Sequence, residues 1–186
     1  MIPANYPTSR NNALASVRKF IQDQCVTPVQ YDVNPPWSLV GSGYENSLPT
    51  PVVSVTSTGL ADLAPMFFGD ELGSGQGSYH QFMAEIQIAD RWSTDNPDAE
   101  HNVWGMRERI WYALNWSAQS RNGVVEVPKI TLYDFDTNPP MDTNSHVFLA
   151  GTDNSWFEKP MMNESDDPNL KRIQILARVQ YLDIRP

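Results

Sequence analysis

The sequence predicts an α+β fold in which a mainly antiparallel sheet carries two helices on one face. Two segments, residues 11–25 and 94–119, repeat apolar residues every three or four positions, as amphipathic helices do. Two others, residues 79–89 and 172–184, alternate apolar and polar residues, as half-buried strands do. Because no regular strand–helix–strand alternation links these segments, an α+β arrangement fits them best. The length of 186 residues predicts one domain spanning 1–186.

The first helix is predicted at residues 11–25. Its apolar residues share one face: Leu14, Val17, Phe20 and Ile21. Ser9 or Asn11 supplies a capping side chain, and Pro28 lies beyond the end of the helix, where the chain cannot continue helical.

A hairpin is predicted between the two helices. Residues 27–50 form a Pro-rich loop, and the β-branched run at 51–56 forms a strand. The cluster Gly73–Gly77 precedes the alternating segment at 79–89. A phosphate-binding loop would instead need a helix directly after the glycines, so we interpret the cluster as the tip of a long hairpin.

The second helix is the best specified element. The turn at residues 94–98 supplies a capping residue, a proline in the first turn and acids at the positive end of the helix dipole. One stripe of the helix is apolar: Val103, Met106, Ile110, Ala113 and Leu114, with Trp104 and Trp111 beside it. Trp116 falls on the opposite, polar side. There it is either covered by a loop or in contact with another subunit, since exposed Trp is enriched in interface cores.

A strand, a long connection and a terminal strand complete the chain. Residues 127–135 predict a strand, and 172–184 predict a long final one. Between them, the acidic loop at 136–170 has only one strand-like stretch, at 146–150. A connection of this length is uncommon in a compact domain unless it has a function or is ordered by a neighbour.

The charge of the chain is unevenly distributed. The chain holds 22 Asp and Glu against 13 Lys and Arg, a net charge of −9. Residues 60–100 carry −7 and residues 136–170 carry −6, which leaves +4 for the remainder. This balance argues against a protein that clamps nucleic-acid phosphates or an anionic membrane. The asymmetry indicates either polar loops or a surface divided between a partner and something anionic.

The sequence shows no targeting feature. The N-terminal residues have no basic start followed by an apolar run, and no stretch approaches the length of a membrane helix. The single cysteine, Cys25, cannot form an internal disulfide and is expected to be a buried thiol. We therefore expect folding in a cytoplasm.

Catalytic and metal-binding patterns are weak. The histidines are far apart in the chain: His80, His101 and His146. A zinc site usually shows at least one close pair of ligands. Four oxygen-bearing residues cluster in the acidic loop and its start: Asp134, Asp136, Asn138 and Asp142. They lack the Gly and Glu of a calcium-binding EF-hand loop, so they favour a solvated acidic loop over the alternative of a divalent-ion site. The chain has no Gly-x-Ser-x-Gly elbow. We expect a non-enzymatic protein without a cofactor or metal.

The order of elements resembles that of the tail terminator and neck proteins of tailed bacteriophages, which form rings between the phage head and tail. The resemblance lies in the following segments: the N-terminal helix at 12–26, the strand pair at 52–56 and 81–90, Pro97–Asp98–Ala99–Glu100 opening the second helix, and the final strand at 173–184. The 27–50 loop and the acidic loop at 136–170 depart from the compact members of that group.

The resemblance implies a virion structural protein that forms a homo-oligomeric, hexameric ring. Such a ring caps the tail tube, docks to connector or sheath proteins, and lets DNA pass without specific binding. No membrane partner is expected. Acidic residues would then face the lumen and repel phosphates, and the candidates are Asp70, Glu71, Asp134 and Asp136. The candidate subunit contacts are Trp116, Gly75, Trp156 and Phe157.

Three other interpretations remain open. Head-completion, collar and baseplate proteins share small α+β designs. A carbohydrate- or host-surface-binding module would use exposed Trp and acidic loops. An acidic mimic of DNA would need carboxylates along one continuous face, whereas this chain concentrates them in two segments.

Overall fold

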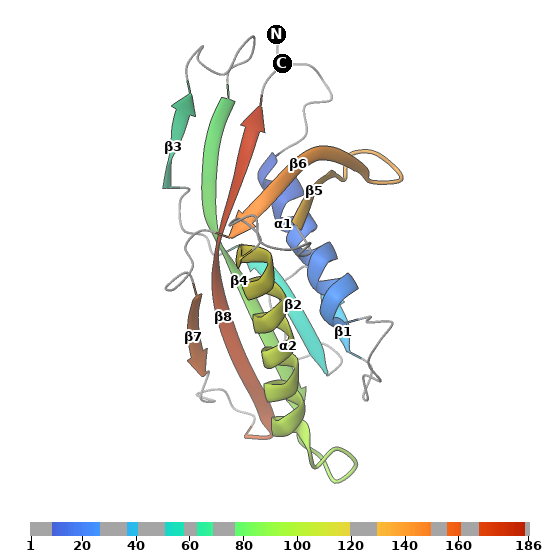
Figure 1. Ribbon diagram of the computed structural model, residues 1–186. Coiled ribbons are helices and arrows are strands. Elements are labelled where there is room, and N and C mark those ends of the chain that lie inside the picture. The colour runs from blue at the N-terminus through green and yellow to red at the C-terminus, as the bar shows by residue number, and fades with distance from the viewer. Residues whose placement is uncertain are drawn as a thin grey trace.

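The computed structural model describes residues 9–26, 37–40, 51–57, 63–68, 77–119, 130–149, 156–160 and 168–184 (Figure 1). The elements are, in chain order, α1 (Ser9–Ile21), the π-helical turn η1 (Gln22–Val26), β1 (Ser38–Val40), β2 (Val52–Ser57), β3 (Leu63–Phe68), β4 (Gly77–Arg91), α2 (Ala99–Gln119), β5 (Ile130–Asp134), β6 (Met141–Leu149), β7 (Trp156–Pro160) and β8 (Leu170–Ile184). The fold is α+β with a mainly antiparallel sheet, as the sequence predicts.

Two long strands form the centre of the sheet. β4 and β8 are 15 residues each and pair antiparallel along their whole length, from Gly77 opposite Ile184 to Arg91 opposite Leu170. The path through the sheet is β1-β2-β4-β8-β6-β5, in which only the β1–β2 pair is parallel. The second edge of β4 is shared by β2 and β3, and the second edge of β8 by β6 and β7.

The alternating sequence of the long strands gives the sheet two unlike faces. The residues that face the helices are buried and apolar: Phe82, Ala84, Ile86 and Ile88 on β4, and Ile173, Ile175, Ala177, Val179 and Tyr181 on β8. The residues between them form the outer sheet face: Gln81, Met83, Glu85 and Gln87 on β4, and Arg172, Gln174, Leu176, Arg178 and Gln180 on β8. Period-two patterning therefore decides which face the helices cover.

Both helices lie on the apolar face. α1 packs mainly against β5, and α2 packs against β4 and β8 (Figure 1). Four of the five residues of the predicted apolar face of α2 are buried: Val103, Met106, Ile110 and Leu114. The fifth, Ala113, is half-buried and packs beside them. These side chains join those of α1, β2, β5 and β6 in one contiguous core.

A smaller apolar cluster lies on the other face of the sheet. Val52, Ala89 and Leu170 are fully buried there, and they occupy neighbouring positions on β2, β4 and β8. The end of the outer sheet face near the start of α2 is therefore covered by the chain itself. Met83 and Arg178 lie on the same face, near the middle of the ladder.

Three strands continue past the helices. β3 pairs with residues 77–81 of β4, next to the last residues of β8, and Figure 1 shows the ends of these strands together beyond both helices. We name β3 with residues 77–79 and 182–184 the sheet arm. A 15-residue strand spans about 50 Å, whereas the 21 residues of α2 span about 32 Å, so one helix cannot cover the ladder.

Most predicted elements are confirmed. The first helix spans Ser9–Ile21 and continues as the π-helical turn, the second begins at Ala99, and the hairpin is the β3–β4 pair. The glycines at 73–76 lie outside the described residues.

Two predicted loops are wrong in part. Residues 27–50 include β1, which pairs with β2. The acidic loop at 136–170 includes β7 and the first half of β6, whose second half, from residue 146, is the predicted strand-like stretch. Both missed strands are short or polar and gain their conformation from a neighbouring edge: β1 from β2 and β7 from β8. The sequence pattern of a short strand does not show which strand edge it will pair with.

Candidate functional site

The start of α2 is fixed by a buried carboxylate. Asp90 is 1% exposed, and its two oxygens accept hydrogen bonds from the Asn96 side-chain amide at 3.0–3.1 Å, from Asn102 Nδ2 at 3.1 Å and from the Arg91 backbone N–H at 2.8 Å. The backbone carbonyl of Asp98 accepts the first helical bond, from the Asn102 N–H at 2.9 Å. These bonds connect the end of β4 to the first turn of α2, so they set the direction in which the helix leaves the sheet.

The outward side of α2 carries an aromatic and acidic surface. Five exposed residues lie within one arc, opposite the buried stripe: His101, Trp104, Gly105, Glu108 and Tyr112. Trp104 is 42% exposed and Tyr112 is 60% exposed. We name these five residues the α2 stripe. Large aromatic side chains on the solvent side of a helix are characteristic of protein contact surfaces.

Gly105 lies in the middle of the α2 stripe. A β-carbon added there would meet no atom within 4 Å, so no crowding inside the described chain requires glycine at this position. Glycine in a helix interior costs about 1 kcal/mol relative to alanine. A close approach from outside the subunit is a physical reason to accept that cost.

A second set of contacts holds the charged part of this helix. The Arg107 guanidinium lies 4.9 Å from the centre of the Trp111 ring and pairs with the carboxylate of Glu108. Glu108 is exposed, and the turn before the helix adds two further exposed acids, Asp95 and Asp98. The turn before α2 is therefore acidic, and Glu108, although paired with Arg107, keeps an exposed carboxylate on the outward side of the helix.

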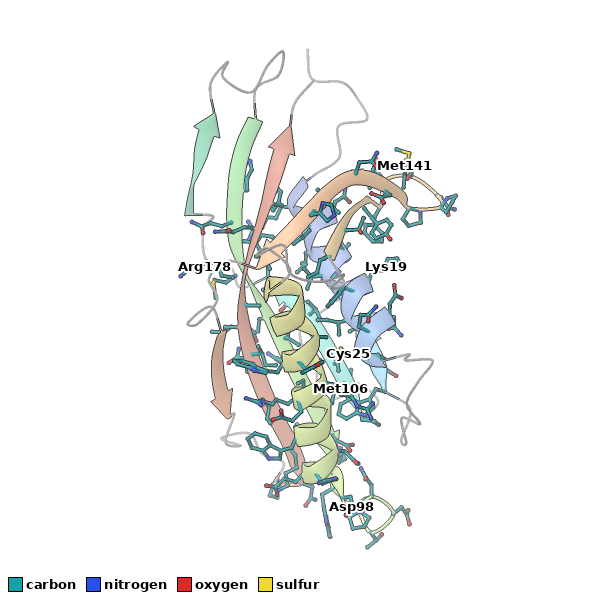
Figure 2. All side chains as sticks on the ribbon, in the orientation of Figure 1. Lys19, Cys25, Asp98, Met106, Met141 and Arg178 are labelled. Carbon is teal, nitrogen blue, oxygen red and sulfur yellow. The ribbon has the colours of Figure 1, made fainter. Side chains whose placement is uncertain are left out.

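The outer sheet face has the opposite character. Arg178 is exposed there and pairs across the ladder with Met83. The described residues of this face include one acid, the half-buried Glu85, which accepts a hydrogen bond from Gln87. Figure 2 shows Arg178 beside β8, on the side away from α2, and Asp98 at the lower end of α2. The basic and acidic surfaces therefore lie on different sides of the subunit.

α1 is attached to β5 by buried polar groups. Asn12 Nδ2 donates to Asp134 Oδ1 at 3.3 Å, and Asn12 Oδ1 accepts from the Phe135 N–H at 3.3 Å. The Ser16 hydroxyl donates to the Asn12 carbonyl at 2.7 Å and accepts from the Tyr133 N–H at 2.9 Å. These bonds satisfy polar groups in a water-poor junction, where an unpaired group would be costly.

η1, which follows α1, carries a buried thiol, and a polar recess lies between α1 and β5. Cys25 is fully buried, as predicted, and burial raises the pKa of its thiol to about 12. Beside it, a recess of about 130 Å³ between α1 and β5 is lined by Lys19, Asp23 and Tyr133 among others. Lys19 donates to Asp23 at 2.8 Å, and that bond raises the pKa of Lys19. The recess is small, and its charged groups already pair with each other.

The predicted subunit-contact residues fall mostly outside what is described. Gly75 lies outside the described residues altogether. Trp116 belongs to α2, while Trp156 and Phe157 belong to β7, and only the backbone of these three is described. Their contact role stays a prediction. The aromatic residues that are described as exposed on α2 are Trp104 and Tyr112, which the sequence interpretation placed beside the core or did not single out.

The predicted lumen-facing acids are divided. Asp70 and Glu71 lie outside the described residues. Asp134 is 9% exposed, and its Oδ1 accepts hydrogen bonds from Asn12 and from the Asp136 N–H at 2.9 Å. This placement gives Asp134 a structural position in the α1–β5 junction and no support for a channel-facing one. Asp136 is exposed on the turn between β5 and β6.

The described residues hold no group of three or more His, Cys, Asp or Glu arranged to bind a metal ion. Of the described helices, none combines the length and apolar character needed to cross a membrane.

The chain was also compared with known proteins. It matches no protein-family model and no curated protein sequence.

Proposed function

We propose that this chain is a structural subunit of a tailed-bacteriophage virion and that copies of it assemble into a ring at the tail terminator or neck. The ring, of about six subunits, caps the tail tube, docks to connector proteins and leaves an open bore for DNA. No chemistry is required of such a subunit. Its function is to present surfaces to copies of itself and to the rings above and below.

The observation that carries the proposal is the sheet arm. Its edge strand β3 has the uncharged sequence LAPMFF, and its other edge pairs with no strand among the described residues. Uncharged edge strands that extend past a helix-covered core invite contact with another chain. A subunit whose sheet reaches beyond its own core is suited to an assembly in which a neighbour completes the cover.

The distribution of exposed acids supports a bore that does not hold DNA. Asp136 is exposed on the turn between β5 and β6, and Asp142 is exposed at the start of β6. A wall of Lys and Arg would bind phosphates with release of counterions and slow DNA at every step. A wall of carboxylates repels them, so DNA moves past it. We assign this turn to the bore.

The proposal is tested by measuring mass and shape in solution. Light scattering after size exclusion is expected to give an oligomer of about six subunits, and negative-stain images are expected to show rings with an open centre. A protein that stays monomeric at every concentration contradicts the proposal. Labelling of phage particles with an antibody against the chain then locates the ring. Label at the head–tail junction supports the neck, and label at the far end of the tail indicates a baseplate role instead.

The bore assignment has its own test. Replacing both carboxylates, Asp136→Lys with Asp142→Lys, is expected to give rings that retard double-stranded DNA in a gel at low salt and release it at high salt. The original rings are expected not to retard DNA under either condition. DNA binding by the original rings would contradict the assignment.

A further inference from the structure

The α2 stripe has the composition of an interface centre. Trp104 and Tyr112 supply large, rigid and partly apolar surfaces. Glu108 lies between them on the same side of the helix, where its bond to Arg107 holds the carboxylate close to the helix surface. Trp and Tyr are enriched among the residues that dominate binding between proteins.

Gly105 is an independent observation at the same place. It lies one turn before Glu108 and next to Trp104, and a β-carbon there would point into open space. The described chain gains nothing from glycine at this position and loses helix stability. A partner surface that comes close to the helix backbone accounts for it.

The outer sheet face offers complementary chemistry. Arg178 is exposed and lies directly across the ladder from Met83. A guanidinium attracts both a carboxylate and the face of Trp or Tyr. A methionine thioether makes favourable contacts with aromatic rings. The pair Arg178 and Met83 therefore matches the acidic and aromatic groups of the α2 stripe.

From this match we infer that the α2 stripe of one subunit docks on the outer sheet face of the next subunit, around Arg178 and Met83. The inference rests on the proposed ring and adds the identity of its contact surfaces. The occupant is a second copy of this chain, because both complementary surfaces lie on one chain and on different sides of the same sheet.

The position of the two surfaces decides the symmetry. A contact between unlike surfaces is heterologous: each subunit presents its helix to one neighbour and its sheet to the other. Such contacts close into rings when the rotation per subunit divides a full turn, and otherwise give filaments. A two-fold dimer would instead need a surface complementary to itself, and the acidic α2 stripe is not, since Glu108 would face Glu108.

Charge reversal tests the contact. Arg178→Glu and Glu108→Arg are each expected to lower the fraction of assembled protein by at least about tenfold, because like charges then face each other. The double variant restores the attraction with reversed sign, so it is expected to assemble again. Asp23→Arg, an equal charge change on η1 outside both surfaces, is the matched control and is expected to leave assembly unchanged.

Size at Gly105 gives a second test. Gly105→Ala is expected to keep or raise the melting temperature, and Gly105→Gln is expected to fold and to lose assembly because its side chain blocks a close approach. Circular dichroism of each variant separates loss of assembly from loss of fold. Assembly is measured by sedimentation velocity and negative stain.

The outcomes separate the two proposals. If the original chain forms no oligomer, the ring proposal fails and the contact fails with it. If rings form and survive all the substitutions, the ring stands and the contact is overturned. If the original chain binds glycans on an array and Trp104→Ala abolishes that binding without changing assembly, the stripe is a carbohydrate surface and the contact is overturned as well.

Discussion

The two helices lie on the same face of one sheet but differ in what surrounds them. α1 buries polar groups as well as apolar ones: Asn12 and Ser16 are nearly inaccessible, and both bond to β5. α2 buries an apolar stripe and keeps its aromatic and acidic residues outside. The buried polar groups Asn12 and Ser16 of α1 therefore serve the fold, whereas the exposed aromatic and acidic residues of α2 remain accessible to a partner.

This difference has a physical origin in the sheet. β5 and β6 lie along the flank of α1, so the helix is covered on more than one side (Figure 1). Arg18 even donates from Nε to the Val55 carbonyl at 2.8 Å, and burial lowers the pKa of its guanidinium. No described strand covers the outward side of α2. A helix covered on several sides must satisfy its polar groups internally.

The largest expected effect contrasts the two sides of α2. Ile110 is fully buried, and Ile110→Ala is expected to lower the free energy of unfolding by about 2–5 kcal/mol through lost burial and a residual cavity. His101, exposed on the outward side of the same helix, is the control, and His101→Ala is expected to change stability by less than about 0.5 kcal/mol in the monomer. Urea denaturation measures both. Equal losses would show that the outer side is packed against the subunit's own chain.

The next effect tests the polar attachment of α1. Asn12→Ala leaves the Phe135 N–H and one Asp134 oxygen without this partner, and is expected to cost about 1–3 kcal/mol. The neighbouring Asn11 is exposed. Asn11→Ala is therefore the control, with little expected change. If both substitutions cost the same, the junction contributes less than its geometry indicates.

The thiol at the end of α1 gives a pH-dependent effect. The folded pKa of Cys25 is raised to about 12 from 9.0, so above pH 9 the unfolded chain loses this proton while the folded chain keeps it. The contribution of the thiol to stability is therefore fully present below pH 9 and is lost as the pH rises toward 12, with a loss on the order of 1 kcal/mol by pH 10. Unfolding free energies at pH 8 and pH 10 measure the fall. Cys25→Ala should show a smaller fall between the same two values, and an equal one would contradict the burial of the thiol.

The smallest effect is a gain on the outer side of α2. Gly105→Ala is expected to raise monomer stability by about 1 kcal/mol, because alanine favours the helix and its β-carbon meets nothing within 4 Å. Thermal unfolding under conditions that keep the chain monomeric measures it. A loss of stability would indicate that part of the chain lies against Gly105.

Elements with their own periodicity could be predicted from the sequence. The stripe from Val103 to Leu114 predicted α2, and the alternation from Ile173 to Tyr181 predicted β8, because burial of one face requires those periods. β7 and β1 have no such pattern, since each depends on the edge of a longer strand. The hydrogen bonds of Asp134 also could not be predicted, because its partner Asn12 is 122 residues away.

The surface of α2 was only partly predictable. The helical period could have placed Gly105 and Tyr112 opposite the core stripe, yet an exposed tyrosine and a single glycine are unremarkable in a sequence. They indicate a contact surface only once the structure shows that Tyr112 is exposed and that a β-carbon at Gly105 would meet no atom within 4 Å. Whether an exposed surface has a complement elsewhere on the chain depends on the three-dimensional arrangement of β8.

The ladder between β4 and β8 also bears on how the protein is made. Residues 77–91 pair with residues 170–184, so the centre of the sheet joins segments about ninety residues apart in the chain. During synthesis, Ile86 and its neighbours have no strand on one side until β8 has left the ribosome. At ordinary rates of translation, about 5–20 residues per second, the edge of β4 that pairs with β8 stays unpaired for several seconds. During that time it can aggregate with other nascent chains. The sheet is therefore completed only after residues 170–184 have been synthesised, and the subunit cannot assemble before then.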